Sequence, residues 1–163
     1  MTIIGTSAFE GCINLREINL SEGLKEIYSY AFKDCKSLTK LVVPKSVYKI
    51  STSILSGCSS LEELEITYFN NAHNSEYAYP LGYLFGTTEY VGGKLTTQTY
   101  KVKNGNTIKD ETYKCYIPEV LRKIKVTAQE YIPHGAFSNM SMVTEIELNQ
   151  QLSIIGKGIF EGC

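Results

Sequence analysis

Apolar residues recur along this chain with a period of 23 positions. Each copy has two adjacent apolar residues, Ala-Phe in the first two copies, then a cysteine, then three aliphatic residues. The first copy consists of Ala8, Phe9, Cys12, Leu15, Ile18 and Leu20, the second of Ala31, Phe32, Cys35, Leu38, Leu41 and Val43, and the third of Ile54, Leu55, Cys58, Leu61, Leu64 and Ile66. Such a period predicts a solenoid, in which each unit buries its apolar side against its neighbours.

Alternation within each unit predicts the strands. In residues 15–20, Ile18 and Leu20 alternate with the polar Glu17 and Asn19, which indicates one buried and one solvent-facing side. The segment from Ser7 to Cys12 is too short for a full helix and predicts a tight turn or a short 3₁₀ piece. Leu24 and Ile27 indicate a second, shorter extended segment on the opposite wall.

The repeats organise the whole chain, residues 1–163, as one solenoid. They start near residues 4, 27, 50, 80, 132 and 155, with insertions at about 67–79 and 89–117. In the second insertion, residues 98–103 and 107–116 flank Asn104-Gly105, the strongest short-range signal for a β-hairpin. We therefore expect a β-hairpin that projects from the solenoid.

Composition excludes several kinds of partner. Sixteen basic and 17 acidic side chains give a net charge of -1, which argues against nucleic acid. No apolar run approaches the roughly 20 residues of a membrane span, and the first residues lack the features of a signal peptide. Because repeats run to both ends, we expect a fragment of a longer array that could oligomerise through its uncapped ends.

The cysteines do not suggest a metal site. Cys12, Cys35 and Cys58 are in repeat register and predict small buried residues whose thiols act as weak donors. Zinc ligands come in pairs two to four residues apart, whereas no two cysteines here are closer than 23. We expect no metal and no cofactor.

The repeat itself has a known counterpart. The pattern I-G-x-x-A-F-x-x-C-x-x-L-x-x-I-x-L-P-x-x-L-x-x-I, taken from residues 4–27 and 27–50, resembles the BspA-like (Treponema pallidum-type) leucine-rich repeats. The interrupted unit at 80–86, with its continuation at 116–121, is similar to a variant from gut Firmicutes. The resemblance implies a right-handed, mainly β leucine-rich-repeat array with a parallel sheet on its concave face. It also implies a secreted or surface-anchored protein that adheres to host or bacterial macromolecules.

One candidate site is the outward strand position, whose charge alternates in sign from repeat to repeat. The row consists of Glu17, Lys40, Glu63, Lys123 and Glu145. It could form a charged groove for a polar ligand or a neutralising ladder that sets strand register. We favour the ladder, because alternating signs cancel the field that would attract a charged partner.

A second candidate is the concentration of tyrosine in the insertions. Eight of the 12 tyrosines lie between residues 67 and 117. Exposed tyrosines mark recognition surfaces, but tyrosine also suits a strand that must dock on a solenoid, and both interpretations stay open. The candidate partner-binding residues are Tyr77, Tyr79, Tyr90, Tyr100, Tyr113 and Tyr116.

The sequence gives little support to a catalytic function. Neither His73 nor His134 lies in a motif that places a nucleophile or carboxylate beside it. The leading hypothesis is therefore a non-enzymatic module that binds a protein or another cell-surface macromolecule. A structural spacer that displays another domain is the second hypothesis, and an enzyme that assembles His73, Glu76 and Asp110 in the insertions is the third.

Overall fold

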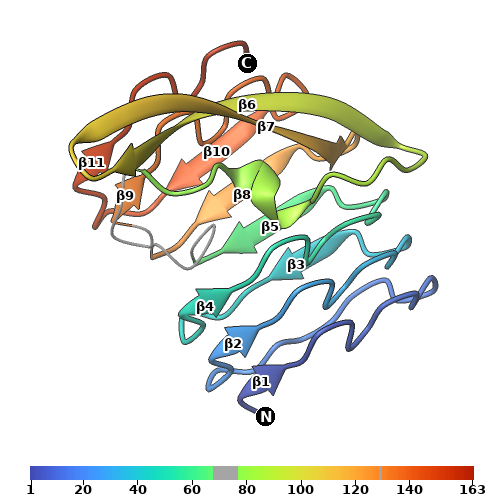
Figure 1. Cartoon of the computed structure of the whole chain (residues 1–163). Helices are drawn as coiled ribbons and strands as arrows, with labels where there is room; N and C mark the ends of the chain where they lie inside the picture. The colour runs from blue at the N-terminus through green and yellow to red at the C-terminus, as the bar shows by residue number, and fades with distance from the viewer. Residues whose placement is uncertain (68–76, 129) are drawn as a thin grey trace.

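Two walls of short parallel strands form the molecule (Figure 1). The computed structural model describes residues 1–67, 77–128 and 130–163. One wall is a four-stranded parallel sheet with the order β10-β8-β5-β3. Its strands are β3 (Lys40–Val42), β5 (Glu63–Ile66), β8 (Lys123–Val126) and β10 (Glu145–Leu148).

The opposite wall consists of two-residue strands in two parallel groups. The first group is β1 (Ile3–Ile4), β2 (Glu26–Ile27) and β4 (Lys49–Ile50). The second group pairs β9 (Tyr131–Ile132) with β11 (Ile154–Ile155). Partners such as Glu26 and Lys49 are 23 residues apart, so the predicted solenoid of parallel, mainly β repeats is confirmed.

The periodic apolar residues fill the space between the walls. Phe32, Phe85 and Phe137 are fully buried, and Leu84 and Phe85 take the adjacent apolar positions of the fourth repeat as predicted. Phenylalanine rings stack between neighbouring repeats, with centroids 5.4 Å apart for Phe9 and Phe32. Each repeat thus completes the core of the next one.

Cys35 and Cys58 are buried and have the predicted role, whereas Cys12, which was also predicted to be buried, is exposed in the first repeat. The thiol of Cys35 donates to the carbonyl of Phe9 at 3.1 Å, and the thiol of Cys58 donates to the carbonyl of Phe32 at the same distance. Burial raises the pKa of Cys35 to about 11 and also raises the pKa of Cys58, so both thiols keep their donating proton. Cys35 and Cys58 therefore each tie one turn to the preceding turn.

The first repeat departs from the expectation. Residues 15–20 form no regular strand, although Leu15, Ile18 and Leu20 pack against the core as predicted. A backbone hydrogen bond from Thr39 to the carbonyl of Arg16, 3.3 Å long, joins this segment to the second repeat. The side chains of this segment thus keep the repeat register without a regular ladder of backbone hydrogen bonds.

The predicted hairpin is present and is longer than expected. Strands β6 (Gly93–Asn104) and β7 (Thr107–Pro118) pair antiparallel along their whole length. The turn is Gly105-Asn106, one residue later than predicted, and the φ of Gly105 is +58°. Glycine at the first turn position is typical of a type II′ turn, which suits the twist of a two-stranded ribbon.

The insertion changes the fourth repeat around the hairpin. A short 3₁₀ helix, η1 (Leu81–Leu84), replaces the turn of the regular repeats. After the hairpin, the amide of Leu121 donates to the carbonyl of Pro118 at 3.1 Å, as the amide of Leu15 does to Cys12 in the first repeat. Pro118 thus stands at the cysteine position. None of the helical segments in the described residues is long and apolar enough to cross a membrane.

Candidate functional site

The hairpin docks on the solenoid through a buried glutamine, Gln98. Its side-chain oxygen accepts a hydrogen bond from the amide of Gly82 at 2.7 Å. Its side-chain nitrogen donates to the carbonyls of Ala136 and Ser138, at 3.1 and 3.2 Å. Gln98 is fully buried, and its amide connects the fourth repeat to the fifth.

Other neighbouring repeats join at this place through the backbone alone, whereas the fourth and fifth repeats combine the bridge with a backbone bond from the amide of Leu81 to the carbonyl of Ala136, at 3.0 Å. The amide of Phe9 donates to the carbonyl of Ala31 at 2.8 Å, and the amide of Phe32 donates to the carbonyl of Ile54 at 2.9 Å. Between the fourth and fifth repeats, Gln98 supplies an acceptor and donors of the same kind. A buried amide with all these bonds satisfied holds its segment in one position.

Other contacts extend along the docked half of the hairpin. Asn139 donates to the carbonyl of Thr97 at 2.6 Å, and the ammonium of Lys94 donates to the hydroxyl of Ser141 at 2.7 Å. Thr96 of β6 and Cys115 of β7, which lie opposite each other in the hairpin, are also buried. The expectation of a projecting hairpin is therefore wrong for its base, because buried polar and apolar groups hold that half. Residues 103–112, around the turn, are exposed.

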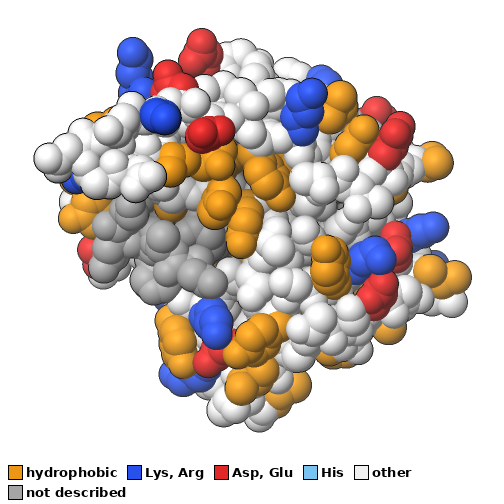
Figure 2. All heavy atoms as spheres, viewed as in Figure 1, with side chains coloured by type: hydrophobic (Ala, Val, Ile, Leu, Met, Phe, Trp, Pro, Cys, Tyr) orange, Lys and Arg blue, Asp and Glu red, His pale blue; other side chains and the backbone are white. Residues whose placement is uncertain are grey.

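Docking gathers four tyrosines, which we call the tyrosine cluster. Tyr79 precedes η1, Tyr83 lies on η1, Tyr100 lies on β6, and Tyr113 lies on β7. The Tyr79 and Tyr83 rings stack with centroids 4.6 Å apart, and the Tyr100 ring lies 5.3 Å from that of Tyr79. The Tyr113 ring lies 6.2 Å from Tyr79 and 6.1 Å from Tyr83. Tyr79 is 43% exposed, and hydrophobic side chains gather below the hairpin on this face (Figure 2).

The cluster is uncharged at neutral pH. Burial raises the pKa of the Tyr83, Tyr100 and Tyr113 hydroxyls, so these groups stay protonated. Each ring offers an apolar face, and each hydroxyl can both donate and accept a hydrogen bond. The arrangement suits non-covalent recognition of another surface.

Three of the six predicted tyrosines lie in the tyrosine cluster, and the other three lie elsewhere. Tyr79, Tyr100 and Tyr113 come together in the cluster, whereas Tyr77 lies beside His134, with ring centroids 5.9 Å apart. Tyr90 donates to the carbonyl of Tyr116 at 3.1 Å at the base of the hairpin, which indicates a structural role for Tyr90.

Tyr83 was not among the predicted candidates. Its ring stacks on that of Tyr79, although Tyr79 lies outside η1, so the spacing rule of a regular helix does not predict this contact.

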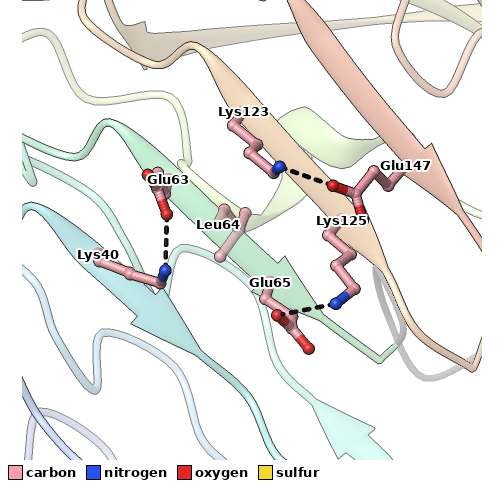
Figure 3. Close-up of a pocket in the computed structure, with 7 residues that line it drawn as sticks. All are labelled: Lys40, Glu63, Leu64, Glu65, Lys123, Lys125 and Glu147. Atoms are coloured by element: carbon pink, nitrogen blue, oxygen red, sulfur yellow. Dashed lines mark ion pairs between the residues drawn. The ribbon is translucent and has the colours of Figure 1, made fainter.

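The alternating charges form the predicted ladder on the four-stranded sheet (Figure 3). Within the predicted row, Lys40 pairs with Glu63 and Lys123 pairs with Glu145, each at 2.7 Å. The neighbouring row, for which no pairing was predicted, adds ion pairs of Lys125 with Glu65, at 3.5 Å, and of Lys123 with Glu147, at 2.6 Å. Every charge in this set has an opposite partner, so the surface has little net field. Glu17, the first member of the predicted row, lies outside the regular strands.

Of the three residues in the enzyme hypothesis, the structure describes Asp110. His73 and Glu76 lie outside the described residues. Asp110 pairs with Lys101 across the hairpin, and the Nδ1 atom of His134 accepts the amide hydrogen of Lys157 at 2.6 Å. No group of three or more potential metal-ligating side chains occurs in the part of the chain that the structure describes.

Comparison with known protein families gives one match. The family model of the BspA type leucine rich repeat region matches in six copies, over residues 1–79 and 98–163. Neither the curated proteins nor the solved structures include a match. The unmatched interval contains η1 and the start of β6, where the repeat is interrupted.

We predict that alanine at Gly135 destabilises the protein more than alanine at Gly158. Both glycines have left-handed φ values, +65° and +66°, at the same position of successive repeats. A Cβ at Gly135 would overlap the backbone carbonyl of Thr99 on the docked hairpin, whereas a Cβ at Gly158 meets only the Glu161 side chain, at 3.1 Å.

The backbone conformation alone costs an alanine about 1–2 kcal/mol in either variant. The overlap adds about 1–3 kcal/mol for Gly135→Ala, unless the hairpin undocks. Urea unfolding measures the difference, and amide exchange in β6 reports undocking. Equal losses of stability with unchanged exchange would show that the hairpin does not rest on Gly135.

The ladder predicts a selective change in a carboxyl pKa. The hydrogen bond from Lys123 lowers the pKa of Glu147, whereas Lys40 is the main cause of the lowered pKa of Glu63. Carboxyls with lowered pKa values stabilise the fold above their ordinary titration range, and this contribution is lost as pH falls through the lowered values. In Lys123→Gln, we expect the pKa of Glu147 to rise towards its ordinary value and that of Glu63 to change less.

Carbon-13 NMR titration of the Glu147 and Glu63 carboxyls measures the two pKa values in the unmodified chain and in Lys123→Gln. Glu63 serves as the control within the same sample. An unchanged Glu147 titration in Lys123→Gln would mean that the ion pair does not form in solution.

Proposed function

The chain belongs to the BspA type leucine rich repeat family, and we propose that it is a non-catalytic protein-binding module of a secreted or cell-surface bacterial protein. In this proposal the solenoid is the rigid support, and the docked hairpin with the tyrosine cluster is the contact surface. Repeat proteins of this architecture present extended surfaces on which binding needs no chemistry.

The tyrosine cluster is the observation that carries the proposal. The segment around η1 and both strands of the hairpin place their tyrosines together, and Tyr79 remains 43% exposed. Rigid aromatic side chains give a large contact area at a low cost in conformational entropy, and tyrosine is enriched among the residues that dominate binding energy. A hairpin that only needed to pack could have done so through Thr96, Gln98 and Cys115, which are buried.

The four-stranded sheet is a weaker candidate for the contact surface. Its lysines and glutamates pair with one another, so a charged partner would have to break ion pairs before it could form new ones. The ion pairs also account for the charged side chains on this face of the sheet without a ligand, since opposite charges on adjacent strands support the strand register.

A binding panel tests the proposal. The full chain is assayed against immobilised extracellular-matrix proteins and bacterial surface proteins, together with two variants. Tyr79→Ala/Tyr100→Ala removes half of the cluster. Tyr48→Ala is the matched control, because Tyr48 is 49% exposed and lies outside the insertions.

We expect the double variant to lose at least about tenfold in affinity for any protein that the unmodified chain binds, since two central aromatic contacts are removed. Tyr48→Ala should bind as the unmodified chain does, and all three proteins should unfold as cooperatively. Equal binding by the double variant would contradict the proposed contact surface. A panel on which the unmodified chain binds nothing would instead favour the structural spacer.

A further inference from the structure

Two segments of the chain carry the acceptor motif for an N-linked glycan, Asn-x-Ser. The first is Asn19-Leu20-Ser21, and the second is Asn139-Met140-Ser141. The motif places a carboxamide nitrogen, which receives the sugar, two residues before a hydroxyl group, and it is typical of exposed sites in secreted proteins. Sequence alone does not separate the two asparagines, so their surroundings in the fold decide which one can react.

The carboxamide of Asn19 is open to solvent. Asn19 and Ser21 are both exposed, and neither side chain forms a hydrogen bond with any of the described residues. Ile18 and Leu20 pack against the core on either side of Asn19, which directs the Asn19 side chain outward. Both groups of the first motif are therefore available to an incoming enzyme.

Weak backbone bonding leaves the segment around Asn19 able to adapt to an enzyme. Residues 15–20 form no regular strand. Within the part of the chain that the structure describes, one backbone hydrogen bond joins them to the second repeat, from the amide of Thr39 to the carbonyl of Arg16 at 3.3 Å. Segments with few such bonds open locally at a low cost in free energy. A transferase that must draw the asparagine away from the fold can therefore do so here.

Space for a sugar lies next to Asn19. A hollow of about 430 Å³ is lined by residues of this segment, among them Asn19, and by Thr39 and Val42 of the second repeat. The side chain of Val42 is 38% exposed. A sugar ring has apolar C–H faces and a rim of hydroxyl groups, so the first sugar can pack on Val42 and form a hydrogen bond with the Thr39 hydroxyl. A glycan on Asn19 thus displaces no buried side chain.

The second motif is also exposed, but the docked hairpin engages its reactive groups. The side-chain nitrogen of Asn139 donates to the carbonyl of Thr97 at 2.6 Å, and the Ser141 hydroxyl accepts from Lys94 at 2.7 Å. The Oδ1 atom of Asn139 lies so close to Gly162 that a Cβ there would overlap it. Asn139 is therefore held between the hairpin and the sixth repeat.

We propose that Asn19 is an acceptor site for an N-linked oligosaccharide and that Asn139 is not. This inference rests on the proposed secreted or cell-surface location, where glycan transferases act. The donor is an oligosaccharide joined to a polyprenyl lipid through pyrophosphate. The Nδ2 atom of Asn19 bonds to the anomeric carbon, the bond from that carbon to the pyrophosphate oxygen breaks, and polyprenyl pyrophosphate leaves. The proton lost from Nδ2 goes to a base of the transferase, and no atom is oxidised or reduced.

Modification of the purified, folded chain tests the inference. The chain is incubated with an oligosaccharyltransferase that requires only Asn-x-Ser or Asn-x-Thr, together with its lipid-linked donor, and mass spectrometry of peptides locates the added mass. Free peptides of residues 14–25 and 134–146 are the controls, since they present each motif without the fold. We expect both peptides to be modified. In the folded chain, Asn19 should react at least about tenfold faster than Asn139, because Asn139 must first release Thr97.

Two substitutions at Ser21 supply the matched comparison. Ser21→Thr retains the hydroxyl of the motif, whereas Ser21→Ala removes it. The hydroxyl of Ser21 bonds to none of the described residues, so neither variant should change the fold, and urea unfolding checks this. We expect Ser21→Thr to be modified as fast as the parent chain and Ser21→Ala at least about tenfold more slowly, which is the scale of one lost hydrogen bond to the enzyme.

Three results would overturn the inference. These are no modification of Asn19 in the folded chain while the peptide of residues 14–25 is modified, equal modification of Asn19 and Asn139 in the folded chain, or equal modification of Ser21→Ala and Ser21→Thr. The proposed function fails separately. A chain that is modified at Asn19 but binds nothing on the panel keeps the acceptor site and loses the protein-binding function, and a chain that binds but is not modified does the reverse.

Discussion

The buried amide of Gln98 is the contact on which the insertion depends. Other neighbouring turns join here through backbone hydrogen bonds alone, whereas the fourth and fifth repeats share a backbone bond from the amide of Leu81 to the carbonyl of Ala136, at 3.0 Å, and the bridge through Gln98. Gln98 strengthens this connection by accepting from Gly82 and donating to Ala136 and Ser138. An apolar side chain there would leave buried backbone groups without partners, at a cost of about 1–3 kcal/mol for each group.

The same contact determines where the tyrosines lie. Gln98 is directly opposite Tyr113 in the hairpin, and Tyr100 is two residues further along β6. When Gln98 is held between the fourth and fifth repeats, these two rings come against Tyr79 and Tyr83. The solenoid thus supplies a fixed support, and the insertion supplies a surface that the regular repeats do not have.

Much of this structure follows from periodicity, and the rest depends on non-periodic contacts. Phe32 and Cys35 occupy positions whose apolar residues recur every 23 positions, and the charge at the position of Lys40 alternates with the same period, so burial and pairing could be predicted together. Gln98 lies in a polar strand with no counterpart in other repeats, and its burial depends on carbonyls about 40 residues away. Tyr83 was missed for a related reason, because its ring neighbours are Tyr79, which lies outside η1, and Tyr113, which lies on the inserted strand β7.

Proton NMR on the folded chain tests the central claim, that Gln98 docks the hairpin and so assembles the tyrosine cluster. Nuclear Overhauser contacts between the Tyr79 and Tyr100 rings report the assembly, since the ring centroids are 5.3 Å apart. The account predicts these contacts in the unmodified chain and their loss in Gln98→Met, with the amide shifts of the first three repeats unchanged. Contacts that persist in Gln98→Met would contradict it.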